Sequence, residues 1–260
     1  MPMTPFTQVL AMADGSGADV PDDWSQGRAG FGGIVAALAL TAARREVTPD
    51  WPLRSFTISF CGPAVGGVEF AVRTLRAGRT AAFIETLVHQ GGSACASATF
   101  CFGPARPSIV ALPPSLPMPA GPPEDHPAIP GQAEGVPAFM RHFEVRPVAG
   151  MVFEGSDGTE LRWWVRHRDA AARGTEAGLV ALLDTLPPAA SVRLPRPAPM
   201  ASLQWMADLD GGGIATDEGW YLLRSAADHA GGGFSGQTMT AWDRAGRALV
   251  HHRQSVGLFA

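Results

Sequence analysis

The 260-residue sequence is 46% hydrophobic, which is enough for one large domain or two small ones with a substantial core. Its net charge of −4 provides no basic surface for nucleic acid or anionic lipid, so we expect a small molecule as the partner. All 20 basic residues are arginine, and the absence of lysine excludes a P-loop, a Schiff-base enzyme and a lysine nucleophile.

The first strong signal in chain order is an apolar stretch from Ile34 to Ala43, interrupted only by Thr41. A helix with apolar residues on every side has to be enclosed. The whole run, from Phe31 to Ala43, is shorter than the about 20 residues that cross a bilayer. It also lacks the basic flank and cleavage site of a secretion signal. We therefore expect a buried helix wrapped by the protein's own sheet, with no membrane contact.

Strand-like segments follow this helix, each alternating in polarity or rich in strand-forming residues. They are Ser55–Phe60, Val68–Arg73, Thr80–His89 and Ser93–Phe102. Gly78 and the run Gln90-Gly91-Gly92 mark turns between the later segments. The first half thus predicts one helix followed by an antiparallel meander.

A proline-rich segment separates the two halves of the chain. Eleven of the 23 prolines lie between Pro104 and Pro137, where the sequence has little periodicity. Such a composition is typical of an extended connection. We predict a first domain over residues 1–105, a linker over 106–137 and a second domain over 138–260.

The second half repeats the order of the first. Its predicted strands are Phe139–Val148, Leu161–His167, Ser202–Ala207, Gly219–Arg224, Gly233–Trp242 and Ala248–Phe259, and its predicted helix is Glu176–Leu186, which Pro187-Pro188 ends. Gly78 and Gly91 fall on Gly233 and Gly246 at a common offset of 155 residues. A repeated order of elements indicates a duplicated fold.

These patterns predict an α+β fold with two repeats, each an antiparallel sheet wrapped around a long central helix. That shape is the hotdog fold, so the chain is predicted to be a double hotdog. We expect the two sheets to pair edge to edge, because pairing removes an exposed strand edge from each.

The second predicted helix carries one carboxylate, Asp184, in its last turn. A helix C-terminus is partially negative, so stability alone disfavours an aspartate there. Burial and the helix dipole would both raise the pKa of Asp184, which suits a general base. The alternative is a surface aspartate beside the proline turn.

Two further polar residues lie on strands beside this helix. Ser202 opens the strand that follows it, and Gln254 shares a face of the last strand with Val250, His252 and Val256 if alternation holds. A glutamine among inward apolar residues needs hydrogen-bond partners. The alternatives are a strand-start hydroxyl for Ser202 and an exposed or satisfied amide for Gln254.

Glycines begin the first helix, and backbone N–H groups at a helix N-terminus can stabilise an oxyanion. Gly32 and Gly33 are therefore candidate oxyanion donors, because glycine permits close approach of a ligand to the backbone. The alternative is that they only allow close packing between the helix and a neighbouring strand.

The sequence resembles the type II acyl-CoA thioesterases and their double-hotdog relatives. Five motifs carry the resemblance: Leu183–Pro188, Ala201–Trp205, Arg253-Gln254, Gly30–Gly33 and Leu75–Arg79. The resemblance implies an acyl-CoA substrate and hydrolysis by an activated water, with Asp184 as the base and with Ser202 and Gln254 orienting the water. It implies no covalent acyl-enzyme. Here serine stands where the best-known members have threonine.

The cysteines Cys61, Cys95 and Cys101 have no metal-binding spacing and leave an odd thiol if two are paired. This favours a reducing compartment, so we expect a cytoplasmic protein with three reduced, mostly buried thiols. His251 and His252, adjacent on a predicted strand, point to opposite faces and cannot easily chelate one ion. We predict no metal, no cofactor, and a homo-oligomer, namely a dimer of double hotdogs.

Two other functions stay open at this point. The chain could be a non-catalytic module that binds acyl-CoA or another acyl ligand. It could also be an enoyl-CoA hydratase, although that chemistry needs an aspartate and a histidine paired near a helix, and we expect no histidine near either helix. Arg76 and Arg79 could contact coenzyme A phosphates, but a solvated hairpin is the better interpretation.

Overall fold

The computed structural model describes residues 3–110, 112, 118–131 and 135–259, and its main elements are eleven strands and two central helices. The first half contains helices α1 (Phe6–Met12) and α2 (Gly32–Arg44) and strands β1 (Gly17–Val20), β4 (Leu53–Phe60), β5 (Gly66–Ala77), β6 (Ala82–Gln90) and β7 (Ser93–Phe102). The second half contains helix α3 (Glu176–Leu183) and strands β8 (Phe143–Ala149), β9 (Glu160–His167), β10 (Met200–Leu209), β11 (Tyr221–Gly231), β12 (Phe234–Asp243) and β13 (Ala248–Leu258). A small separate sheet pairs β2 (Ser25–Gln26) with β3 (Ala29–Gly30).

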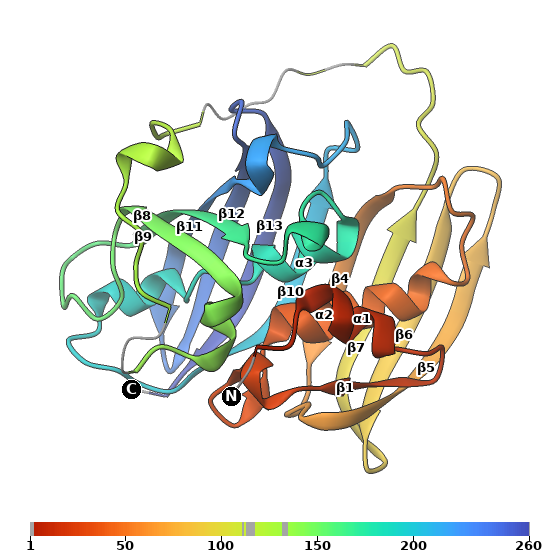
Figure 1. Cartoon of the computed structure of the whole chain (residues 1–260), viewed down its shortest axis with the longest axis horizontal. Coiled ribbons are helices and arrows are strands. Elements are labelled where there is room, and N and C mark those ends of the chain that lie inside the picture. The colour runs from red at the N-terminus through yellow and green to blue at the C-terminus, as the bar shows by residue number, and fades with distance from the viewer. Residues whose placement is uncertain (1–2, 111, 113–117, 132–134, 260) are drawn as a thin grey trace.

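These eleven strands form one antiparallel sheet in the order β1-β5-β6-β7-β4-β10-β13-β12-β11-β9-β8 (Figure 1). Strands β5, β6 and β7 form the predicted meander of the first half. Strand β4 precedes them in sequence, but it pairs with β7 and so ends the first block of strands. The α+β double-hotdog prediction is confirmed.

The two blocks join through β4 and β10, which pair from Ser59 and Gln204 to Ser55 and Asp208. The edge-to-edge pairing predicted from the repeat is therefore present. It satisfies the backbone N–H and C=O groups that each half alone would expose along an edge strand. The junction also brings the end of β4 next to the start of β10, where the candidate site lies.

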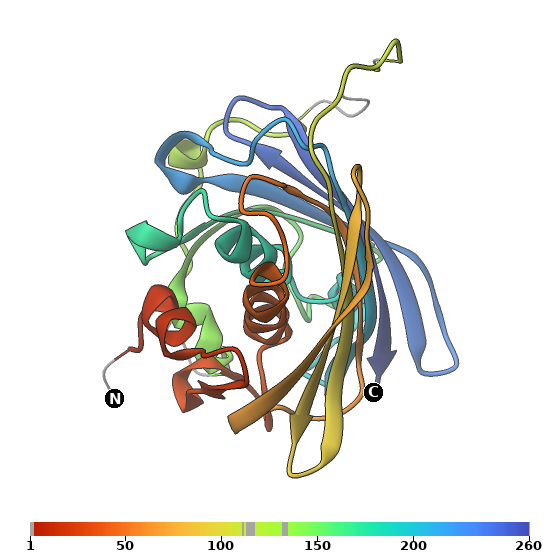
Figure 2. The same cartoon turned by 90° about the vertical axis from the view of Figure 1, so that its right-hand side faces the viewer.

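Helices α2 and α3 lie against each other in the hollow of the curved sheet, as Figure 2 shows. Helix α2 is buried on nearly every side, which explains its apolar sequence. A Cβ added at Gly33 would lie 2.4 Å from the Ala181 carbonyl oxygen, so glycine is required for this contact between the helices. The close packing that we considered for Gly33 occurs, but against α3 and not against a strand.

Several predicted element ends differ from the structure; for example, β11 continues to Gly231, whereas we expected it to end at Arg224. Residues Ala138–His142 form a 3₁₀ helix before β8, whereas we expected a strand from Phe139; Pro137 precedes this turn, and Phe139 and Met140 bury their side chains in it. Helix α3 ends at Leu183 and not at Leu186, because the backbone of Asp184 already leaves the helical conformation.

The cysteine prediction is correct in part. All three cysteines are free; Cys95 is buried and Cys101 is half-buried, but Cys61 is exposed. Burial raises the pKa of the Cys95 and Cys101 thiols.

Part of the segment between β7 and β8 packs against the second block of strands. Residues 111, 113–117 and 132–134 of the predicted linker lie outside the described residues. Met118 and Ala120 pack on a second apolar cluster that contains Trp164, Trp220 and Trp242. These two linker residues therefore cover tryptophans on the outer face of the second block.

Among the described residues, none of the helices has the length and the apolar character needed to span a bilayer.

Candidate active site

Asp184 follows α3 directly, and its backbone (φ −93°, ψ 7°) ends the helix. The next residue secures this end: the Thr185 hydroxyl donates to the Leu182 carbonyl at 2.7 Å. Asp184 is only 8% exposed. The alternative of a surface aspartate is therefore wrong.

Two hydrogen bonds hold the buried carboxylate. Gln254 on β13 donates from Nε2 to Asp184 Oδ1 at 2.6 Å, and the backbone N–H of Gly33 in the first turn of α2 donates to the same side chain. Asp184 thus lies at the partially negative end of α3 and at the partially positive end of α2. The N-terminus of α2 therefore supplies the favourable potential for the carboxylate that the C-terminus of α3 does not.

Burial raises the pKa of Asp184 to about 7, although the hydrogen bonds from Gln254 and Gly33 oppose the rise. The direction is the one predicted from the sequence, and desolvation is its main cause. A carboxyl group with this pKa is about half ionised near neutral pH. It can therefore accept a proton from water under physiological conditions.

A pocket of about 560 Å³ opens onto Asp184. Its walls come from both halves of the chain and include Gly32 at the start of α2, Phe60 at the end of β4 and Ser202 near the start of β10. A bulge in β10 between Ser202 and Gln204 lies at this wall, and bulges re-aim side chains beside active sites. Asp184 and Ser202 therefore share one cavity, while Gln254 reaches the carboxylate without lining the cavity.

The two glycines named as oxyanion donors have different surroundings. Gly33 gives its N–H to Asp184. Gly32 lines the pocket, and a Cβ added there would lie 2.6 Å from Asp184 Oδ2 and 3.2 Å from the Phe60 ring. Only Gly32 of the two therefore borders the space that a substrate would enter.

Gly32→Ala is expected to lower kcat by about tenfold to 100-fold while the protein stays folded, because the new methyl group displaces the Asp184 carboxylate by a fraction of an ångström. Steady-state turnover and a thermal melt measure the two quantities. Gly67→Ala is the matched control, since a Cβ at Gly67 meets no atom within 4 Å. An unchanged kcat in Gly32→Ala would show that this contact does not set the position of the carboxylate.

Sequence reasoning missed two residues at this site. Gln237 on β12 is fully buried and donates from Nε2 to Gln254 Oε1 at 2.9 Å. The available signal was its alternation with the buried Met239 and Ala241, which places an amide on the inward face of a core strand. Arg28, an exposed residue between β2 and β3, lines the pocket. A single arginine in a loop offers no pattern to detect.

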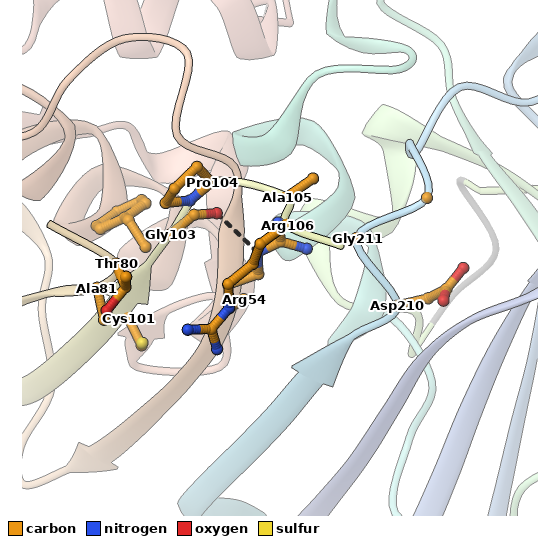
Figure 3. A pocket seen from close by; sticks show the side chains of 12 residues that line it. Arg54, Thr80, Ala81, Cys101, Gly103, Pro104, Ala105, Arg106, Asp210 and Gly211 are labelled. Carbon is orange, nitrogen blue, oxygen red and sulfur yellow. Dashed lines mark hydrogen bonds between the residues drawn. The ribbon is translucent and has the colours of Figure 1, made fainter. Parts of the chain in front are cut away.

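A second pocket, of about 580 Å³, lies at the other end of β4 (Figure 3). It is lined by Arg54, Arg106 and Asp210 among others, and Arg54 Nε donates to the Gly103 carbonyl at 2.8 Å. It contains no predicted catalytic residue, and its carboxylate, Asp210, is exposed. The pocket at Asp184 is therefore the stronger candidate site.

The arginines considered for phosphate contacts do not lie at either of these two pockets. Arg76 and Arg79 are exposed, in β5 and in the turn that follows it. Their placement agrees with the solvated-hairpin interpretation.

One expectation about histidine is wrong. His167 on β9 lies against α3, with Nε2 2.8 Å from the Gly178 carbonyl oxygen, because the chain turns back after β9 and packs the following helix against this strand. Burial lowers the pKa of His167 to about 4, so its ring is neutral. It does not line the Asp184 pocket. The aspartate–histidine pair that a hydratase needs is therefore not formed with Asp184.

The last strand carries His251 exposed and His252 buried, so the two histidines point to opposite faces as predicted. His252 Nδ1 accepts a hydrogen bond from the Trp205 indole at 3.1 Å, and burial lowers the pKa of His252 to about 3. Within the described ranges, no three histidine, cysteine or acidic side chains cluster closely enough to hold a metal ion.

Comparisons with known proteins agree with this architecture. The family model of the acyl-CoA thioesterase N-terminal domain matches residues 20–103, and that of the acyl-CoA thioesterase C-terminal domain matches residues 120–258. No curated protein sequence matches the chain.

Several solved structures share the fold. A protein of unknown function with a hotdog fold from Alicyclobacillus acidocaldarius superposes with a TM-score of 0.86 at 24% identity, covering 100% of this chain and 99% of the other. The tesB protein of Mycobacterium avium subspecies paratuberculosis gives 0.76 at 21% identity, with 98% and 100% covered. An acyl-CoA thioesterase II from Mycobacterium marinum gives 0.74 at 20% identity, with 98% of both chains covered.

Proposed function

The chain belongs to the acyl-CoA thioesterase family and is a thioester hydrolase, and from this premise we propose that it hydrolyses acyl-CoA to a free carboxylic acid and coenzyme A with a water molecule activated by Asp184. The observation that carries the proposal is the buried carboxylate with a raised pKa that borders a pocket shared with Ser202. Burial of an ionised acid at the C-terminal end of a helix lowers stability, so we attribute its placement to a catalytic role.

In the proposed reaction, the ionised Asp184 removes a proton from water as the oxygen attacks the thioester carbonyl carbon. The C–S bond then breaks, and the proton passes from Asp184 to the departing sulfur. Gln254 fixes the orientation of the carboxylate through its 2.6 Å hydrogen bond. The Ser202 hydroxyl, which lines the same pocket, is proposed to hold the attacking water.

The developing oxyanion needs hydrogen-bond donors. We assign this role to the first turn of α2 at Gly32, where the helix dipole favours negative charge. The Gly33 N–H has Asp184 as its partner instead. Arg28 at the pocket offers a cation for the phosphates of coenzyme A.

A thiol-release screen across short, medium, long and aryl CoA thioesters tests the proposal. Turnover of at least one substrate class is expected, together with no hydration of crotonyl-CoA. Tight acyl-CoA binding by calorimetry without thiol release from any substrate would overturn the proposal and favour the binding module. Hydration of crotonyl-CoA without thiol release would favour the hydratase.

A further inference from the structure

We propose that Gln237 is a positioning residue for this reaction: it holds the Gln254 amide in the one orientation that donates to Asp184. The inference rests on the proposed role of Asp184 as the base. It adds to the site a positioning residue that does not line the pocket.

A chain of three hydrogen bonds connects the backbone to the carboxylate. The Ala189 backbone N–H donates to Gln237 Oε1 at 2.9 Å. Gln237 Nε2 donates to Gln254 Oε1 at 2.9 Å. Gln254 Nε2 donates to Asp184 Oδ1 at 2.6 Å. Gln237 and Gln254 are direct cross-strand partners on β12 and β13, so the sheet itself fixes their spacing.

The direction of this chain is set at its far end. A backbone N–H can only donate, so the atom of Gln237 that faces Ala189 has to be the oxygen. The nitrogen of Gln237 then faces Gln254 and requires the oxygen of that amide. The nitrogen of Gln254 is thereby left to face Asp184, whose ionised form can only accept. Each amide orientation follows from the one before it.

Stability gives no reason for this pair of amides. Gln237 is 0% exposed and Gln254 is 4% exposed, and both lie on the face that packs toward the helices. Burying an amide is costly unless its hydrogen bonds are made, and two apolar side chains would fill the same space without that requirement. The network is satisfied only as a set, which is what a device for fixing one orientation requires.

Without Gln237, the Gln254 amide loses the partner that fixes its orientation. It can then turn its oxygen toward Asp184, and a carbonyl oxygen hydrogen-bonds only to the protonated acid. The pKa of Asp184 would rise further, because the neutral form gains a partner and the ionised form loses one. The loss of activity would therefore depend on pH, being largest below the midpoint of the acid limb and smallest well above it.

The test is the pH dependence of kcat for thiol release in Gln237→Leu, with Thr240→Val as the control. Thr240 is also buried on β12, and its hydroxyl has no partner among the described residues. For Gln237→Leu we expect the acid-side midpoint to move up by about one pH unit, kcat to fall about fivefold at pH 7, and activity to recover largely at pH 9. KM and the control profile should stay unchanged.

A double-mutant cycle shows whether Gln237 acts through Gln254. Adding Gln237→Leu to Gln254→Leu is expected to cause no further shift of the midpoint, because the orienting residue then has nothing to orient. Additive shifts, or a pH-independent loss in Gln237→Leu, would overturn the inference. If Gln237→Leu fails to fold, Gln237→Met serves instead: its flexible side chain has a similar length but cannot donate to Gln254. An unshifted midpoint in Gln237→Met would overturn the inference as well.

Failure of this inference is distinguishable from failure of the proposed function. An unshifted Gln237→Leu profile beside an inactive Asp184→Asn variant removes only the role of Gln237. A fully active Asp184→Asn variant removes the base itself.

Discussion

Asp184→Asn is expected to lower kcat for thiol release from acyl-CoA by about 10²–10⁴-fold, the range typical for loss of a general base. Asparagine keeps the size of the side chain, and its oxygen can still accept from Gln254, but it cannot take a proton from water. Thiol release by the purified variant measures the loss. Acyl-CoA binding by calorimetry shows whether the pocket is intact.

Asp208→Asn is the matched control. Asp208 lies on β10, the strand that also carries Ser202, but it is exposed and borders neither of the two pockets. Its turnover should equal that of the wild type. Equal turnover in Asp184→Asn, with the variant folded, would contradict the proposed mechanism.

Asp184→Asn is also expected to change how the free energy of unfolding depends on pH. The pKa of Asp184 is about 7 in the folded protein, compared with an ordinary value of 3.8. Between these values the folded state binds a proton that the unfolded state releases, so the free energy of unfolding falls as pH rises. The wild type should lose about 3 kcal/mol relative to Asp184→Asn between pH 5 and pH 8.

Urea unfolding of both proteins at several pH values measures this difference. His167 and His252 have lowered pKa values, so they destabilise the fold as pH falls below their ordinary value of 6.5. They are present in both proteins, and their contribution cancels in the comparison. Parallel stability curves for the two proteins would show that Asp184 is already ionised in the folded state at pH 5.

Much of the fold could be predicted because its signals are local or repeated. The apolar run that became α2 excludes a polar face, and strands such as Ser93–Phe102 show clear alternation. The shared glycine offset places turns at Gly91 and Gly246, which adopt the positive φ angles of 56° and 89°. The 3₁₀ turn at 138–142 was missed, because aromatic residues before a strand look like part of that strand.

The site was less accessible to sequence reasoning. Asp184 stood out because an acid at the end of an apolar helix conflicts with local stability. The hydrogen bond from Gly33 to Asp184 depends on how α2 and α3 pack. The hydrogen bonds that connect Asp184 to Gln237 through Gln254 depend on the register of β12 and β13. Neither is encoded in a local pattern. The contact of His167 with α3 spans only 11 residues, but the connection between β9 and α3 carries no signal of how the helix packs on the strand.

The pH profile of the single-turnover rate constant for thiol release tests most directly whether a buried Asp184 with a raised pKa is the base. Activity should fall as pH is lowered through about 7, since protonation of Asp184 removes the base. A rate that stays constant from pH 8 down to pH 5 would contradict this account.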